Sequence, residues 1–373
     1  MLLIKNAYIK TMAGEDIANG CILVDDNGKI ADVGIGLTAP EGAEIIDAEG
    51  RLVTPGCIDA HTHIGIIGTN EIVDPVTPHL RGIDNVDPYD PDFADGIKAG
   101  VTAACTGPGS ANVIGGTFSA IKLYGTNVDK MIIKQDLAMK CAFGENPKKI
   151  YGSRGKSPSS RMGTAAVLRE FLFKAKKYAD EANAGIDHKF DMKLEAMLPV
   201  MRGEIPLKAH CHQADDILTA IRIAKEFGLK MTLDHCTDGA YIADEVAESG
   251  FPALLGPLFG KKSKIELAHK SFETPGILHK AGVEICIVTD CCVIPISILP
   301  LCAGLSVAEG LDYEAGWRAI TINPAKILGI NDRVGSLEKG KDADIVIWTM
   351  DPLTEVGARS YMTIVDGKVV YKA

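Results

Sequence analysis

The segment between residues 206 and 235 most narrows the choice of fold, because a strand, a helix and a second strand follow one another there. The strands are predicted over residues 206–210 and 229–235 from their apolar runs. Gly228 is placed to end the helix, so the connections are short. Two strands joined in this way run parallel, with a right-handed crossover. The apolar face of the helix would consist of Ile217, Ala220, Ile221, Ala224 and Phe227.

The same alternation of strand and helix extends through the middle of the chain. An apolar strand over residues 283–289 ends at Asp290 and follows a helical stretch over residues 276–281. A pattern of this length favours a closed barrel over an open sheet. We therefore predict an α/β fold in which residues 54–337 form a (β/α)₈ TIM barrel.

Both ends of the chain have a different pattern, with short strands separated by tight turns. Near the start, two strands flank the turn sequence Asp-Asp-Asn-Gly at residues 25–28. Near the end, Asp-Gly at residues 366–367 separates two further strands. Two all-β ends around an α/β middle imply that the ends meet. We predict one small split β-sandwich, built from residues 1–53 and 338–373.

Composition excludes several classes of protein. Hydrophobic residues make up 46% and charged residues 24% of the chain, as in globular proteins. The net charge of −10 argues against a nucleic-acid-binding surface, which would be basic. The apolar runs are too short for a membrane span, and the first residues become polar too soon for a signal peptide. With ten cysteines, we expect a cytoplasmic protein that acts on a small molecule and has no nucleic-acid or membrane partner.

Histidines gather at the predicted strand ends. His61 and His63 lie in Asp-Ala-His-Thr-His after an apolar strand, so their side chains face the same side. His210, His235 and Asp290 each end another strand. Parallel barrels bring all C-terminal strand ends to one mouth, where their active sites lie. These residue types at that mouth predict a site for a divalent metal, with Zn²⁺ or a similar borderline ion as the cofactor.

Two longer motifs resemble the amidohydrolase superfamily. Residues 54–63 read Thr-Pro-Gly-Cys-Ile-Asp-Ala-His-Thr-His, which matches its first-strand signature. Residues 335–346 read Gly-Ser-Leu-Glu-Lys-Gly-Lys-Asp-Ala-Asp-Ile-Val, which matches the segment that leaves the barrel. The resemblance implies a barrel with a split β-sandwich, a mono- or binuclear divalent metal centre and a homo-oligomer. It points to the imidazolonepropionase and the Xaa-Pro or isoaspartyl dipeptidase branches.

The resemblance also implies a role for each ligand. His61 and His63 would hold the more buried metal, and His210 and His235 the second. Asp290 would bind the first metal and move the proton, so that Asp290 and His235 are the expected catalytic residues. The expected reaction is hydrolysis of an amide, cyclic amide or dipeptide-like C–N bond by metal-activated hydroxide.

A binuclear centre in this superfamily needs an anionic bridge from the fourth strand. Residues 138–147 contain two candidates, Lys140 and Glu145. The Lys-Cys-Ala run resembles the strand that carries a carboxylated lysine in the isoaspartyl dipeptidase branch. Burial beside metals also favours the neutral amine that reacts with CO₂. We expect carboxylated Lys140 as the bridge, with Glu145 as the alternative.

Gln213 bears on the alternative activity, that of a deaminase or cyclic-amidine hydrolase. A deaminase branch carries His-x-x-Glu after the fifth strand, and here residues 210–213 read His-Cys-His-Gln. Glutamine cannot exchange a proton as that glutamate does, which favours amide hydrolysis. A non-catalytic scaffold on the same fold is a further alternative, and the retained ligands speak against it.

Three further residues are candidates for binding substrate. His212 has the strand parity to face the mouth, although it could equally cap the following helix. Tyr151 and Arg154 could hold a substrate carboxylate, unless their polar loop is only a solvated surface. Four cysteines directly follow proposed ligands and are expected to point outward, into the layer between strands and helices: Cys141, Cys211, Cys236 and Cys291.

Overall fold

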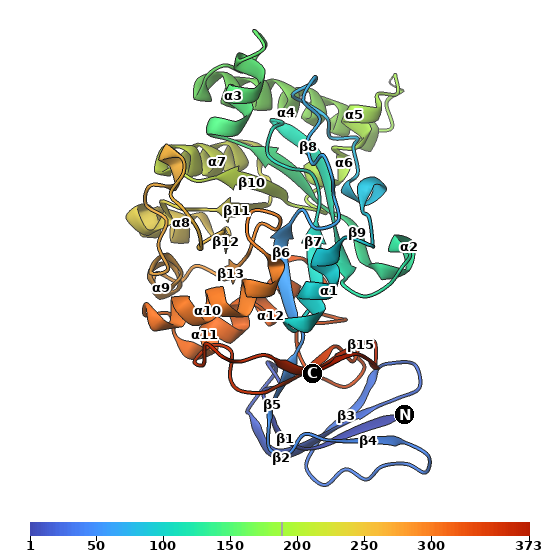
Figure 1. The fold of residues 1–373 in the computed structure, drawn as a ribbon. Coiled ribbons are helices and arrows are strands. Elements are labelled where there is room, and N and C mark those ends of the chain that lie inside the picture. The colour runs from blue at the N-terminus through green and yellow to red at the C-terminus, as the bar shows by residue number, and fades with distance from the viewer. Residues whose placement is uncertain (188) are drawn as a thin grey trace.

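The computed structural model describes residues 1–187 and 189–373, which form two eight-stranded sheets (Figure 1). The first sheet lies in the middle of the chain and is surrounded by helices. The second draws its strands from both ends of the chain and lies beside the first. The architecture is therefore mixed α/β, with the first sheet nearly closed into a barrel.

In the barrel sheet, each strand from β6 to β13 pairs with the next one along the chain. Most neighbours are parallel, but β8 is antiparallel to both β7 and β9. The strands are β6 (Cys57–Thr62), β7 (Val101–Thr106), β8 (Ile114–Lys122), β9 (Ile132–Ala142), β10 (Leu207–Cys211), β11 (Met231–His235), β12 (Ala253–Leu255) and β13 (Ile285–Ile287).

The antiparallel strand β8 corrects the prediction of a strict (β/α)₈ alternation. Residues 107–113 join β7 to β8, and this connection is too short for the crossover that parallel strands require. A connection of that length joins antiparallel neighbours instead. The other barrel strands keep the predicted common direction, so their C-terminal ends still share one mouth.

The strand–helix–strand unit that the sequence predicts around α7 (Ala214–Phe227) is confirmed. The flanking strands β10 and β11 pair in parallel, with Lys208 opposite Thr232. Gly228 ends the helix with a φ of 66°, a left-handed conformation that glycine adopts without strain. The predicted helix face is buried at Ile217, Ala220, Ile221 and Ala224.

The remaining helices lie around the barrel (Figure 1). They are α1 (Pro91–Lys98), α2 (Val128–Met131), α3 (Glu145–Gly152), α4 (Arg161–Asn183), α5 (Met192–Glu195), α6 (Leu198–Met201), α8 (Ala243–Ser249), α9 (Thr274–Lys280), α10 (Leu299–Ala308), α11 (Tyr313–Ala319) and α12 (Ile322–Ile327). Short 3₁₀ turns occur at Gly82–Asn85, Gly239–Ile242, Ile265–Leu267 and Ile296–Ile298. Among the described residues, none of the helices combines the length and apolar character needed to cross a bilayer.

The second sheet has the order β16-β15-β14-β5-β1-β2-β3, with β4 paired to β1. It therefore brings the two ends of the chain together, as the short strands and turns suggest. Lys122 of the barrel fixes this sheet, because its Nζ lies 3.0, 2.7 and 3.1 Å from carboxylate oxygens of Asp342, Asp344 and Asp366. The strands are β1 (Leu2–Ile9), β2 (Ile17–Val24), β3 (Ile30–Gly34), β4 (Glu44–Asp47), β5 (Leu52–Pro55), β14 (Ile345–Trp348), β15 (Ser360–Val365) and β16 (Lys368–Lys372).

Candidate metal centre

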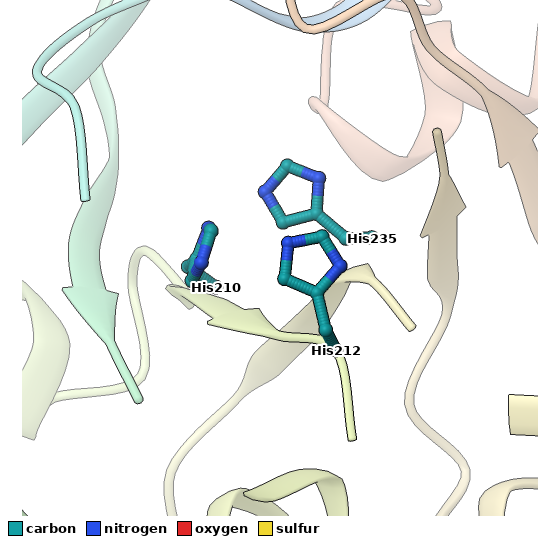
Figure 2. Close-up of side chains that lie close together, drawn as sticks. All are labelled: His210, His212 and His235. Carbon is teal, nitrogen blue, oxygen red and sulfur yellow. The ribbon is translucent and has the colours of Figure 1, made fainter. Parts of the chain in front are cut away.

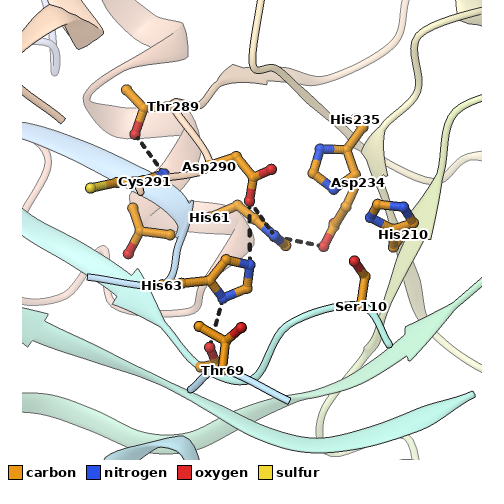
Figure 3. Close-up of polar contacts among 12 residues, drawn as sticks. His61, His63, Thr69, Ser110, His210, Asp234, His235, Thr289, Asp290 and Cys291 are labelled. Atoms are coloured by element: carbon orange, nitrogen blue, oxygen red, sulfur yellow. Dashed lines mark hydrogen bonds and ion pairs between the residues drawn. The ribbon is translucent and has the colours of Figure 1, made fainter. Parts of the chain in front are cut away.

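The residues predicted as ligands meet at the C-terminal mouth of the barrel, where Figure 3 shows most of them. The end of β6 supplies two imidazoles and β9 supplies an amine, while β10, β11 and the segment after β13 each supply one side chain. All are buried or nearly so. They are His61, His63, Lys140, His210, His235 and Asp290.

Asp290 lies at the centre of this group. Its Oδ1 is 3.6 Å from Nε2 of His61 and 3.3 Å from Nε2 of His63. His61, His235 and Asp290 each offer one ligand atom, and these three atoms lie within 4.8 Å of one another. Lys140 completes the group, with its Nζ 3.2 Å from Nε2 of His61. Imidazole and carboxylate donors at this spacing fit a divalent ion such as Zn²⁺.

Backbone carbonyls fix the orientation of two imidazoles. Nδ1 of His63 lies 2.7 Å from the carbonyl oxygen of Gly107, and Nδ1 of His235 lies 2.6 Å from that of Gly256. A carbonyl only accepts, so each Nδ1 carries the proton and each Nε2 keeps its lone pair. This is the arrangement that orients metal-bound histidines in proteins.

A buried carboxylate performs the same task for His61. Oδ2 of Asp234 lies 2.8 Å from Nδ1 of His61 and 3.3 Å from Nζ of Lys208. Burial alone would raise the pKa of Asp234, but Lys208 and His61 outweigh it and hold that pKa well below its usual value. Neither Asp234 nor Lys208 was predicted from the sequence, although Lys208 has the strand parity of His210 and therefore also faces the barrel interior.

Burial sets the protonation of the ligands. It lowers the pKa of His61, His210 and His235, so these imidazoles are neutral and able to bind a cation. For Asp290, burial is opposed by His235 and His63, and the net effect holds its pKa below the usual value. The carboxylate of Asp290 is therefore ionised.

Two of the predicted ligands have unusual backbone conformations. His235 has a φ of 73° and Asp290 a φ of 54°, in the left-handed region that residues with a Cβ seldom adopt. Such conformations persist only where the surrounding structure enforces them, and they cluster at functional sites. Backbone strain therefore occurs at two of the positions whose side chains point into the mouth of the barrel.

The two candidates for the bridging ligand, Lys140 and Glu145, have different surroundings in the structure. Lys140 is fully buried beside His61, and burial lowers its pKa towards the neutral amine. Glu145 begins α3, and its Oε1 lies 2.9 Å from Nζ of Lys148 and 3.2 Å from Nη1 of Arg161. The geometry therefore favours Lys140 as the residue that reaches the ligands.

His212 joins His210 and His235 in a cluster of three imidazoles (Figure 2). The rings of His212 and His235 are stacked, with centroids 4.6 Å apart and planes inclined by 14°. Imidazole lone pairs lie in the ring plane, so two stacked rings do not aim at one ion. Nδ1 of His212 contacts Oγ1 of Thr237 at 2.7 Å, and Gln213 instead occupies the cap position of α7. His212 therefore faces the mouth and does not cap the helix.

Tyr151 and Arg154 occupy positions that do not suit the predicted role of binding a substrate carboxylate. The Tyr151 hydroxyl lies 3.2 Å from the carbonyl oxygen of Glu71 and 2.9 Å from that of Asp74. Arg154 donates through Nη1 to the carbonyl of Ile72. Both side chains fasten the 71–74 loop, and we assign them a structural role.

The side chain of Gln213 has no acid–base role, because it is engaged in a hydrogen bond. Its Oε1 accepts a hydrogen bond from Nη2 of Arg161. The same guanidinium donates through Nε to Oδ2 of Asp216 at 3.0 Å. The position that carries a glutamate in the deaminase pattern thus belongs to a network at the start of α7.

Several polar groups beside His210 were not predicted from the sequence. Nδ2 of Asn146 lies 2.8 Å from Oγ of Ser110 and 3.4 Å from Nε2 of His210. Nζ of Lys264 lies 3.0 Å from Oδ1 of Asn146 and 3.6 Å from Oε1 of Glu266. Asn146 lies in the first turn of α3, Ser110 in the connection between β7 and β8, and Lys264 just before the 3₁₀ turn at Ile265–Leu267, so no short motif in the sequence relates them.

Known proteins resemble this chain in sequence and in structure. A sequence profile described as "Amidohydrolase family" matches residues 52–370. The crystal structure of an amidohydrolase from Thermotoga maritima MSB8 has a TM-score of 0.95 and 39% sequence identity, with 100% of both chains covered. Amidohydrolase tasK from Hapsidospora irregularis is 32% identical over 367 residues, which cover 88% of this chain but only 37% of that protein. An imidazolonepropionase from Acidiphilium cryptum (strain JF-5) is 25% identical over 399 residues, with 94% of each protein covered.

Proposed function

The chain belongs to the amidohydrolase family, whose members hydrolyse carbon–nitrogen bonds, and we propose that it cleaves an amide bond of a small molecule at a binuclear metal centre. The observation that carries this proposal is the convergence of imidazole, amine and carboxylate donors at the mouth of the barrel. The substrate would be an amide, a cyclic amide or a dipeptide-like compound.

Two sets of ligands would hold the ions, for which we propose Zn²⁺. His61, His63 and Asp290 would bind one ion, and His210 and His235 the other. We propose that carboxylated Lys140 bridges them, which its burial and its contact with His61 support. When bound, the ions would lower the pKa of a water molecule and polarise the substrate carbonyl.

Asp290 is the group we assign to proton transfer. Its carboxylate is ionised and lies among the ligand nitrogens, 3.3 Å from Nε2 of His63. It would accept a proton from the attacking water and pass that proton to the leaving nitrogen. His235, whose Nδ1 is held by the carbonyl of Gly256, would keep the lone pair of its Nε2 available for the second ion.

The polar groups beside His210 support a proposal about the substrate. Lys264 provides an ammonium group near the mouth, and Asn146 provides an amide next to His210. We propose that these two groups hold a carboxylate on the leaving half of the substrate. His212 lies on the same side of the mouth, stacked on His235, and would contact the substrate there.

Cellular location and assembly are further parts of the proposal. The ten cysteines are all free in the described chain, which supports a reducing, cytoplasmic location. We also propose a homo-oligomer without nucleic-acid or membrane partners, for which the net charge of −10 argues as far as nucleic acid is concerned.

The activity can be tested with a panel of N-acyl amino acids, dipeptides and imidazolones incubated with metal-loaded protein. We expect hydrolysis of at least one class, and a loss of about 10²–10⁴-fold in kcat for Asp290→Asn. Full activity in that variant would contradict the assignment. If ammonia released from ring amines were the main product, the deaminase alternative would replace the proposal.

A further inference from the structure

A cluster of two thiols and a carboxylate lies just behind the metal centre. Asp92, Cys291 and Cys292 each offer one ligand atom, and these atoms lie within 4.8 Å of one another. Asp92 comes from the first turn of α1, and the cysteines directly follow Asp290. Figure 3 shows the sulfur of Cys291 directed away from the histidines. The cluster is therefore separate from the ligands of the main centre.

The contacts within the cluster leave the carboxylate of Asp92 without a cation. Sγ of Cys291 donates a hydrogen bond to Oδ2 of Asp92 at 3.1 Å. No lysine, arginine or histidine forms an ion pair with Asp92 among residues 1–187 and 189–373. The neighbouring Asp90, by contrast, accepts hydrogen bonds from the backbone N–H groups of Gly65 and Asp92. A carboxylate that faces two thiols and has no cationic partner is suited to bind a cation.

The exposure of the three side chains gives an ion a route to the cluster. Cys291 is buried, Asp92 is partly exposed and Cys292 is exposed. The other cysteines that follow ligands, Cys141 and Cys236 among them, are completely buried, as the sequence predicts for thiols packed between strands and helices. Cys291 is equally buried but differs from those thiols because its sulfur contacts the carboxylate of Asp92, and Cys292 differs because it is exposed.

We propose a further metal site, separate from the main centre, that is formed by Asp92, Cys291 and Cys292. It takes a thiophilic divalent cation such as Zn²⁺ or Cd²⁺. Thiolates select soft and borderline ions, and one carboxylate with two sulfurs leaves a position for water. Each thiol releases its proton to solvent when its sulfur binds the ion. The main centre offers only nitrogen and oxygen donors, so the two sites differ in ligand chemistry.

The backbone connects the proposed site to the main centre. The N–H of His63 donates to the carbonyl of Cys291, and the N–H of Asp290 donates to the carbonyl of His61 at 3.1 Å. An ion that fixes Cys291 therefore also fixes the segment that carries Asp290. The proposal does not depend on the reaction catalysed at the main centre.

Cadmium titration of the metal-free, full-length protein tests this site, because thiolate-bound Cd²⁺ has an ultraviolet charge-transfer band that nitrogen and oxygen ligands do not produce. We expect a band that reaches a plateau when this cluster holds one Cd²⁺ per chain, with any Cd²⁺ at the main centre adding nothing to the band. Cys292→Ser should abolish the band or weaken Cd²⁺ binding by at least about tenfold, and Asp92→Asn should weaken it in the same direction. Cys21→Ser, a free cysteine in the second sheet, is the matched control and should leave the band unchanged.

The outcomes separate this site from the main centre. A band that persists in His61→Ala and disappears in Cys292→Ser supports the proposal, whatever the metal content or activity of the main centre. Absence of the band in the wild-type protein, or an unchanged band in Cys292→Ser, would overturn it. Circular dichroism of each variant shows whether a lost band reflects unfolding.

Discussion

Oδ2 of Asp59 accepts two hydrogen bonds from Thr289, one from its backbone N–H at 3.0 Å and one from its hydroxyl at 2.5 Å. Oδ1 of the same carboxylate accepts the backbone N–H of His61 at 3.1 Å. Asp59 lies on β6, and Thr289 follows β13, the last strand of the barrel sheet. One buried carboxylate thus joins the first and last strands where His61 and Asp290 emerge.

Replacing Asp59 with asparagine keeps the shape but turns one acceptor oxygen into a donor NH₂. A buried donor group of Thr289 or His61 is then left without an acceptor, which costs about 1–3 kcal/mol. We expect a lower urea midpoint and reduced metal content for Asp59→Asn. Thr289→Val, which removes only the hydroxyl, should cost less. Equal stability and metal content in Asp59→Asn and wild type would show that the carboxylate does not hold the two strands together.

Asp234 orients His61, and its removal should weaken metal binding. Asp234→Asn removes the charge that lies 2.8 Å from Nδ1 of His61, so we expect about 10–100-fold weaker affinity in a chelator competition. Thr232→Val is the matched control, because Thr232 donates at 2.7 Å to the other carboxylate oxygen, Oδ1. The assignment is wrong if both variants bind metal as tightly as the wild type.

Lys264 should set the preference for a substrate carboxylate. Loss of one charge-assisted hydrogen bond predicts that Lys264→Met raises KM for a carboxylate substrate by about tenfold or more, with little change for its carboxamide. Lys261→Met removes a lysine of the same exposed loop and should have a smaller effect. Paired steady-state assays on the two substrates measure the difference. A parallel rise of KM for both substrates would argue against recognition of the charge.

The buried carboxyl group of Asp216 should make the free energy of unfolding depend on pH. Burial, only partly offset by Arg161, raises the pKa of Asp216 in the folded protein to about 6, from the 3.8 of an unperturbed aspartate. Between these values the folded state binds more protons than the unfolded state, so the contribution of Asp216 to stability falls as pH rises from about 4 to about 6. Asp216→Asn lacks this titration.

Urea unfolding of wild type and Asp216→Asn across that pH range measures the effect. The free energy of unfolding of the wild type, minus that of the variant, should decrease with rising pH. A constant difference would mean that Asp216 does not titrate there.

The strand ends explain why much of the site was predictable. A His-x-His pair after an apolar strand, and a histidine or aspartate after three others, place ligands through backbone geometry alone. The alternation around α7 is likewise local, because the helix face and Gly228 specify it. The antiparallel strand β8 was not predicted, since its direction follows from a connection whose two ends the sequence pattern did not mark.

Contacts between segments far apart in the sequence were beyond prediction. Lys264 and Asn146 are far apart in the sequence and meet only in the folded barrel. Tyr151 and Arg154 were expected to face substrate, because their residue types suit a carboxylate. Their partners are backbone carbonyls in the 71–74 loop, and a carbonyl acceptor leaves no mark in the sequence.

Metal content is the most direct test of the binuclear centre. Plasma mass spectrometry on protein purified without chelator or added metal should give about two ions per chain for the main centre, when every protein compared carries Cys292→Ser so that the proposed thiolate site contributes no ion. Lys140→Ala should fall to about one or fewer, whereas Glu145→Ala should keep the wild-type value, because Glu145 pairs with Lys148 and Arg161. One ion per chain in all three proteins, or a loss confined to Glu145→Ala, would contradict a centre bridged by Lys140.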